Sequence, residues 1–166
     1  MAAAIPDHIR RTTTDRARAW AHEMRAVHAR LRAAIEVARD SVEAGAGLTP
    51  PDRELLLHCW GFCAALDGHH RAEDEHLFPR IGAALPHLVP VLAQLRQDHA
   101  MIGHLLGQLG RALDEGAAAA EQLRHLDGIE AVMETHFRYE ELRLLDVLDQ
   151  VVPEGVTAPD LFGPLA

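Results

Sequence analysis

The sequence predicts an all-α fold, an up-down-up-down antiparallel four-helix bundle with a C-terminal tail. β-branched residues are sparse, Ala, Leu, Arg and Glu dominate, and no segment alternates with a period of two, so strands have little support. Gly/Pro clusters at 43–51 and 82–90, with a weaker break at 113–121, divide the chain into four long segments. All four are amphipathic and their connections are short, which is typical of antiparallel bundles. We expect one domain over residues 1–152 and a tail over 153–166.

Apolar residues recur at spacings of three and four within each segment, so each should turn one face to a shared core. The second segment also has a helix-start signal, Thr49 followed by Pro50. In the tail, Leu161 and Phe162 are the expected anchors against the outside of the bundle. The predicted core stripes are Trp20, Met24, Val27, Leu31, Ile35 and Ala38; Leu55, Cys59, Phe62, Leu66, Leu77 and Ile81; Leu88, Leu92, Leu95, Ile102, Leu106, Leu109 and Leu113; and Leu126, Ile129, Met133, Phe137, Leu144, Val147, Leu148 and Val151.

Length and charge exclude several classes of protein. The 166 residues suffice for one well-buried domain, and a formal net charge of −9 argues against a nucleic-acid partner, which needs a surplus of Lys and Arg. No apolar run approaches the roughly 20 residues of a membrane span, and the opening MAAAIPDHIRR lacks a signal-peptide core. We therefore expect a cytoplasmic protein without a membrane partner. Cys59 and Cys63 lie four residues apart, which is the spacing of neither a CxxC redox pair nor a zinc knuckle. We expect two buried thiols.

Every apolar stripe is interrupted by a histidine, and two stripes add a glutamate one turn later. Residues four apart on a helix are displaced by roughly 40° and about 6 Å, so an HxxxE pair can reach one point. The candidates are His28 in the first segment, His69 and Glu73 in the second, His99 in the third, and His136 and Glu140 in the fourth. His70 and Asp74 follow an adjacent apolar face of the second segment, so periodicity alone leaves the choice between the two faces open.

Polar groups in these positions need partners, because an unpaired buried polar group costs on the order of a few kcal/mol. A metal site would satisfy all of the candidates together. Imidazole nitrogen with carboxylate oxygen suits iron, with manganese and zinc as competitors. Six ligands are many for one tetrahedral zinc ion, and bridging carboxylates favour two metal ions.

Two motifs carry a family resemblance. HHRAEDEHLFP resembles the HHxxEExxLFP signature of the hemerythrin-like HHE cation-binding family, and HFRYEELRLL is similar to its HFxxEE fourth-helix motif. VHARLRAAI and DHAMIGHLL resemble the first- and third-helix histidine segments, so the resemblance covers roughly residues 20–150. It implies a four-helix bundle that holds two iron ions, usually as an Fe–O–Fe centre. It also implies ligands at His28, His69, Glu73, His99, His136 and Glu140, with His70 and Asp74 as supporting residues behind them.

The sequence departs from the oxygen-carrying members of that family. Those have HxxxH on the third helix, whereas Gly103 stands four after His99 here and the next histidine, His104, comes one residue late. They also have HxxxxD on the fourth helix, whereas HxxxE favours Glu140, with Glu141 in reserve; Tyr139 is a further possible ligand, although packing is its ordinary role. Losing a histidine opens a coordination position to water, peroxide or another small ligand.

These features favour a diiron centre that reacts with H2O2 or O2. The alternative is a sensor or carrier of O2, NO or iron that performs no turnover. A ferritin-like carboxylate bundle, with Glu-x-x-His on two helices, is set aside because only Glu73 and His76 show that pattern.

Overall fold

The structure is a computed structural model that describes residues 7–45, 53–152 and 155–166. Its helices are α1 (Asp7–Gly45), α2 (Arg53–Ala72), the π-helical turn η1 (Glu73–Leu77), α3 (Phe78–Ala84), the 3-10 turn η2 (Pro86–Leu88), α4 (Val89–Asp114), α5 (Ala119–Leu144), α6 (Leu148–Val151) and α7 (Ala158–Phe162). None of the described residues forms a strand. The chain is therefore an all-helical bundle, as predicted, although the start signal at Thr49 and Pro50 falls outside the described residues.

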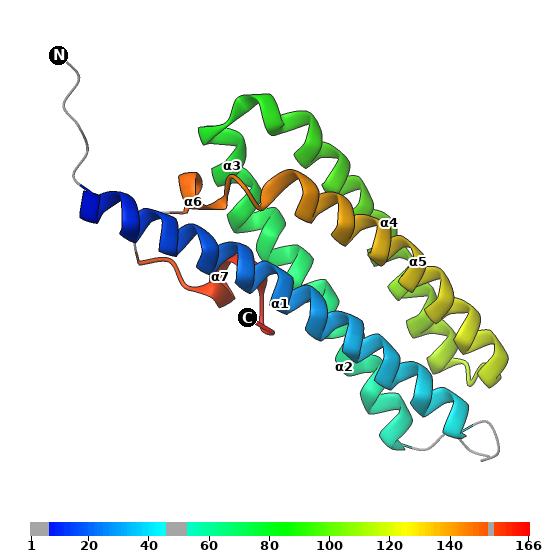
Figure 1. Ribbon diagram of the computed structural model, residues 1–166. Coiled ribbons are helices and arrows are strands. Elements are labelled where there is room, and N and C mark those ends of the chain that lie inside the picture. The colour runs from blue at the N-terminus through cyan, green and yellow to red at the C-terminus, as the bar shows by residue number, and fades with distance from the viewer. Residues whose placement is uncertain (1–6, 46–52, 153–154) are drawn as a thin grey trace.

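The bundle is held together along its long helices. α1 packs against α2 and α5, and α4 packs against α5, as Figure 1 shows. The predicted stripes supply most of the core, and Met24, Leu66, Leu95 and Met133 are fully buried. Arginines of α1 also pair with acids of α5: Arg32 Nε lies 2.5 Å from Glu134 and Arg39 Nη1 lies 2.6 Å from Asp127.

The second predicted helix is one continuous stripe in sequence, but its backbone changes character at Glu73. The N–H of Phe78 donates to the Glu73 carbonyl five residues back, which is the hydrogen bond of a π-helix. Pro79 explains the change, because it has no N–H to donate and its ring crowds the preceding turn. Single π-helical turns occur often at functional sites, and this one begins on a candidate ligand.

The tail is buried more deeply than the sequence predicts. Leu161 and Phe162 are fully buried, and α7 packs against α1, α2 and η1 instead of lying only against the outside. The Trp20 and Phe162 ring centroids are 6.1 Å apart. Leu161 and Phe162 thus belong to the core of the bundle.

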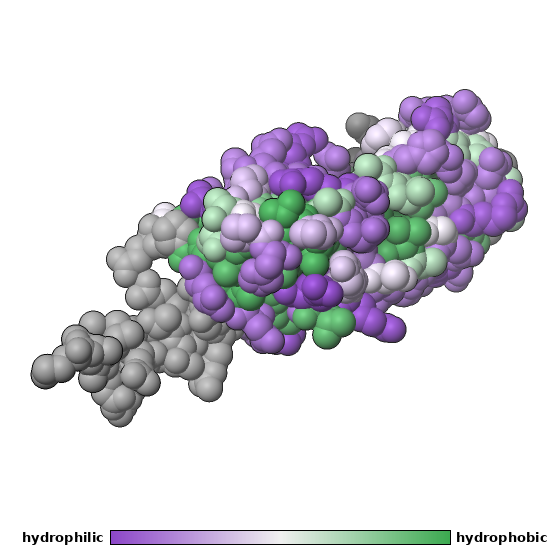
Figure 2. All heavy atoms as spheres, turned by 90° about the horizontal axis from the view of Figure 1, so that it is seen from above, coloured by the Kyte–Doolittle hydropathy of each residue, from purple (hydrophilic) through white to green (hydrophobic). Residues whose placement is uncertain are grey.

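One face of the molecule is largely polar. Figure 2 shows hydrophilic residues over most of the face seen from above, with smaller hydrophobic patches between them. Across the described part of the chain, no helix combines the length and the apolar character needed to cross a membrane. Cys59 is buried, as predicted, whereas Cys63 is only partly buried. Burial raises the pKa of the Cys63 thiol to about 12, which keeps it in the unreactive thiol form.

Candidate metal centre

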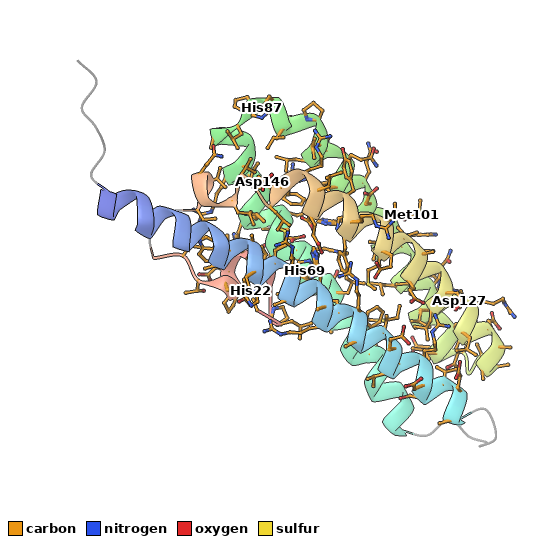
Figure 3. All side chains as sticks on the ribbon, in the orientation of Figure 1. His22, His69, His87, Met101, Asp127 and Asp146 are labelled. Atoms are coloured by element: carbon orange, nitrogen blue, oxygen red, sulfur yellow. The ribbon has the colours of Figure 1, made fainter. Side chains whose placement is uncertain are left out.

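The structure brings all six residues predicted from the sequence to one buried place in the bundle. They come from α1, α2, η1, α4 and α5, and His69 lies in the middle of the bundle in Figure 3, whereas His87 lies in the connection before α4. Four of the six are fully buried and the other two nearly so: His28, His69, Glu73 and Glu140 are 0% exposed, His136 1% and His99 6%.

The donor atoms form two groups, in each of which one ligand atom per residue lies within 4.8 Å of the others. The first group is His28, His69, Glu73 and Glu140, and the second is His70, His99 and His136. The glutamates also face the second group, because Glu73 Oε2 lies 3.5 Å from His99 Nε2 and Glu140 Oε2 lies 3.8 Å from His136 Nε2. Each carboxylate is therefore within reach of both groups.

His70 lies closer to the other donor atoms than the resemblance implies. The resemblance implies a supporting residue behind the ligands, but His70 is 5% exposed and belongs to the second donor group itself. Its ring stacks on His99, with centroids 4.1 Å apart. Adjacent residues on a helix differ by about 100° in direction, so His69 and His70 point to different groups. Both of the faces that periodicity could not separate thus carry a residue of a donor group.

The outer nitrogens of four imidazoles face acceptors. Nδ1 of His28 lies 2.8 Å from Glu141 Oε1, and Nδ1 of His69 lies 2.9 Å from the Phe162 carbonyl oxygen. On the other side, Asp74 Oδ1 lies 3.0 Å from His99 Nδ1 and Asp98 Oδ2 lies 3.6 Å from His136 Nδ1. Protons held at Nδ1 leave the lone pairs on Nε2, directed inward, which is the arrangement around metal-ligating histidines.

Aromatic rings stack on the imidazoles that α1 and α4 contribute. The His28 ring stacks on Phe137 at 3.9 Å, and the Arg32 guanidinium lies over the Phe137 ring, 5.3 Å from its centroid. Likewise, the His99 ring stacks on Phe78 at 5.4 Å, and Arg96 lies 5.7 Å from the Phe78 centroid. These stacks leave the two lone histidines little freedom to rotate.

Burial keeps most of the imidazoles neutral. It lowers the pKa of His69 to about 3 and that of His136 to about 4, and it lowers the pKa of His70 well below its usual value, with the neighbouring His99 adding to that shift. A neutral imidazole offers the lone pair that a metal ion requires.

The pKa values of the two carboxylates, Glu73 and Glu140, shift in opposite directions. Burial and the charge of Glu140 raise the pKa of Glu73 well above its usual value. For Glu140, burial acts upward but the imidazoles of His28 and His136 outweigh it, so that its pKa falls to about 2. Burial acts against protonation of His28, yet Glu140 and Glu141 raise its pKa. Without a cation, protonation of Glu73 and of His28 is therefore favoured, and it relieves the repulsion among the buried carboxylates.

The donor set fits a metal ion. Among the described residues, buried ligand atoms without a hydrogen-bond partner include Nε2 of His28, His69 and His70 and both carboxylate oxygens of Glu73 and Glu140. Nε2 of His99 also lies only 3.1 Å from Nε2 of His136, where two lone pairs would repel. Such atoms are costly when unpaired, and cations between them would satisfy all of them.

Three side chains that the sequence left as possible ligands lie elsewhere. His104 is exposed and its Nε2 lies 2.9 Å from Gln108 Nε2. Tyr139 is partly buried, with the Arg143 guanidinium 5.7 Å from its ring centroid. Glu141 contacts the outer nitrogen of His28 instead of the inner one.

A solvent-facing pocket of about 310 Å³ reaches the second donor group. His70, Asp74, Arg96, His99 and Gly103 are among its lining residues. Gly103 occupies the position where oxygen carriers place a histidine, and a Cβ there would meet nothing within 4 Å. The missing side chain therefore leaves open space beside His70 and His99.

One comparison with known proteins gave a match. The family model described as the hemerythrin HHE cation binding domain matches residues 21–148. No curated protein and no solved structure matches significantly.

Proposed function

Because this chain belongs to the hemerythrin HHE cation-binding family, we propose that it is a non-haem diiron protein whose centre reacts with hydrogen peroxide or dioxygen. The observation that carries the proposal is the pair of donor groups that share the two glutamates Glu73 and Glu140. Two groups joined by carboxylates suit two metal ions, and imidazole with carboxylate suits iron over softer metals. The short connections between helices also support the alternating up-down order of the bundle.

We assign the ligands by the group in which each donor lies. His28 and His69 would hold one ion and His70, His99 and His136 the other, with Glu73 and Glu140 between them. Iron there would exchange electrons with the peroxide and polarise it. The protein positions the donors: Asp74 Oδ1 lies 3.0 Å from the outer nitrogen of His99, Glu141 faces that of His28, and the Phe137 ring stacks on the His28 imidazole.

The ligand count predicts where a small molecule binds. The half with His28 and His69 has two imidazoles, whereas the other half has three. With the same shared carboxylates, the first half keeps more coordination positions for peroxide or dioxygen. This differs from the expectation based on the third helix, because His70 replaces the histidine that is missing at Gly103.

Hydrogen peroxide is the substrate to test first. Two molecules of H2O2 give two of water and one of O2, so one peroxide is oxidised, the other is reduced, and no external reductant is needed. We expect the iron-loaded protein to evolve O2 from H2O2 faster than the same concentration of free iron, as measured with an oxygen electrode. A rate equal to that of free iron would contradict the enzyme proposal.

The second candidate function is a sensor or carrier of O2, NO or iron without turnover. The position of His70 favours it, because five imidazoles and two carboxylates make a fuller donor set than the six residues predicted from the sequence. A visible absorption band that forms in air and bleaches reversibly under argon, without O2 evolution from peroxide, would support this function.

We predict that His70→Ala removes one of the two metal ions. The second donor group would keep only His99 and His136, so its affinity should fall by more than the roughly 10–100-fold that supporting residues cost. Metal analysis after dialysis should give about one ion per chain, compared with about two in the wild type. His104→Ala is the matched control, because that imidazole is exposed and contacts Gln108. Two tightly held ions in His70→Ala would return His70 to a supporting role.

A further inference from the structure

We propose that the C-terminal segment Ala158–Ala166 is part of the metal centre, because the Phe162 carbonyl holds the His69 imidazole with Nε2 directed at the metal position. The inference rests on the proposed function, since it concerns the ion that His69 would bind. It assigns a positioning role to a segment that lies outside the residues matched by the family model, 21–148.

The contact between Phe162 and His69 fixes which nitrogen can bind metal. His69 Nδ1 lies 2.9 Å from the Phe162 carbonyl oxygen, and both residues are fully buried. A carbonyl only accepts hydrogen bonds, so Nδ1 must carry the proton and donate it. Nε2 then keeps its lone pair, 3.4 Å from Glu73 Oε1. Without the tail, His69 would lose the partner that selects this tautomer.

Glycine allows the tail to come this close to α2. Gly163 has φ of +81°, and a Cβ there would lie 2.7 Å from the Gly68 carbonyl oxygen and 2.9 Å from the His69 Cα. These neighbours are backbone atoms of a helix, so they cannot move aside cheaply. On the opposite side of the crossing, a Cβ at Gly68 would lie 3.0 Å from Pro164 Cδ. The tail crosses α2 backbone against backbone at the residue before His69.

Further contacts hold the tail in place. Leu161 and Phe162 insert into the core, and the Arg30 guanidinium donates to the Leu165 carbonyl. The tail supports only one half of the centre: the outer nitrogens of three other imidazoles, those of His28, His99 and His136, face side-chain carboxylates on α5, η1 and α4, namely those of Glu141, Asp74 and Asp98. Displacing the tail should therefore weaken the His69 half and spare the other half.

The test compares alanine at two glycines of the tail, one inside the segment Ala158–Ala166 and one just before it. Gly163→Ala should displace the tail and lower the affinity for one of the two metal ions about 10–100-fold. The affinity for the other ion should stay unchanged. Gly155→Ala is the matched control, because Gly155 has φ of +85° and a Cβ there meets nothing within 4 Å. It carries the same backbone cost without the collision. Binding is measured by titration with Fe(II) under argon and by metal analysis.

Two readouts do not depend on metal. Nitrogen-15 NMR of the metal-free wild type should show His69 protonated at Nδ1 and bare at Nε2, and Gly163→Ala should show a mixture of tautomers. Hydrogen exchange at the amides of 161–163 reports whether the tail has been displaced. Gly68→Leu is the second variant, because the leucine side chain would collide with Pro164. Leucine has a higher helix propensity than glycine, so a loss of helix α2 would not explain the effect of this variant.

The outcomes separate this proposal from the proposed function. A wild type that binds no iron contradicts the diiron function, while the tautomer of His69 still tests the role of the tail. If the tail amides exchange rapidly in Gly163→Ala while both ions keep their wild-type affinity, the tail has no positioning role. Tail amides that stay protected in Gly163→Ala would overturn the requirement for glycine at the crossing, and a proton on Nε2 in the wild type would overturn the hydrogen-bond assignment.

Discussion

Glu140→Gln should abolish both metal binding and peroxide decomposition. The Glu140 carboxylate lies 3.3 Å from His28 Nε2 and 3.8 Å from His136 Nε2, so it serves both donor groups. An amide carries no charge and is a poor substitute for a carboxylate that joins two cations. We expect fewer than one ion per chain after dialysis and O2 evolution no faster than with free iron.

Glu130→Gln is the matched control for this substitution. Glu130 lies on the same helix, but its carboxylate pairs with Arg39 at 2.5 Å and is partly exposed. The control should keep two ions and the wild-type rate, because a surface ion pair contributes only about 0–1 kcal/mol to stability. Two ions and full turnover in Glu140→Gln would show that this carboxylate does not join the two groups.

Removing the metal should lower the thermal stability strongly. An ion that binds only the folded chain adds about 2.7 kcal/mol when its free concentration is 100 times its dissociation constant, so two such ions add about 5 kcal/mol. For a chain of this size, 1 kcal/mol shifts the melting temperature by roughly 2–4 °C, which predicts a difference of about 10–20 °C. Circular dichroism of the iron-loaded and the chelated protein measures this difference.

A core substitution distinguishes this effect from general stability. Leu126 is fully buried among the apolar residues of α5, and Leu126→Ala should cost about 2–5 kcal/mol in both forms. The difference between loaded and chelated protein should stay the same in Leu126→Ala and disappear in Glu140→Gln. A chelated wild type as stable as the loaded protein would mean that the buried donors find partners without a cation.

The sequence predicts the fold and much of the site because both depend on periodicity. A residue such as His99, placed four after Leu95 and three before Ile102, must lie on the buried face of its helix, and the structure buries it. The HxxxE pairs could be recognised for the same reason, since a spacing of four is local geometry.

The features that the sequence could not predict depend on contacts between distant segments. The place of His70 among the donor atoms follows from where α4 and α5 lie around α2, since its own spacing fitted a face that looked merely apolar. The π-helical turn had a local signal, Pro79, but a proline near a helix end is common and does not specify the hydrogen bonds of the preceding turn. The tail contact had no periodic signal, because a single backbone carbonyl makes it.

The link between His69 and Phe162 also sets an order of events during synthesis. The two residues are 93 positions apart, so at about 5–20 residues per second the ribosome adds the acceptor roughly 5–20 s after the imidazole. Throughout that interval the nascent chain contains the His69 imidazole but not the carbonyl that orients it. The arrangement in which the Phe162 carbonyl holds the His69 imidazole can therefore form only after residue 162 has been synthesised.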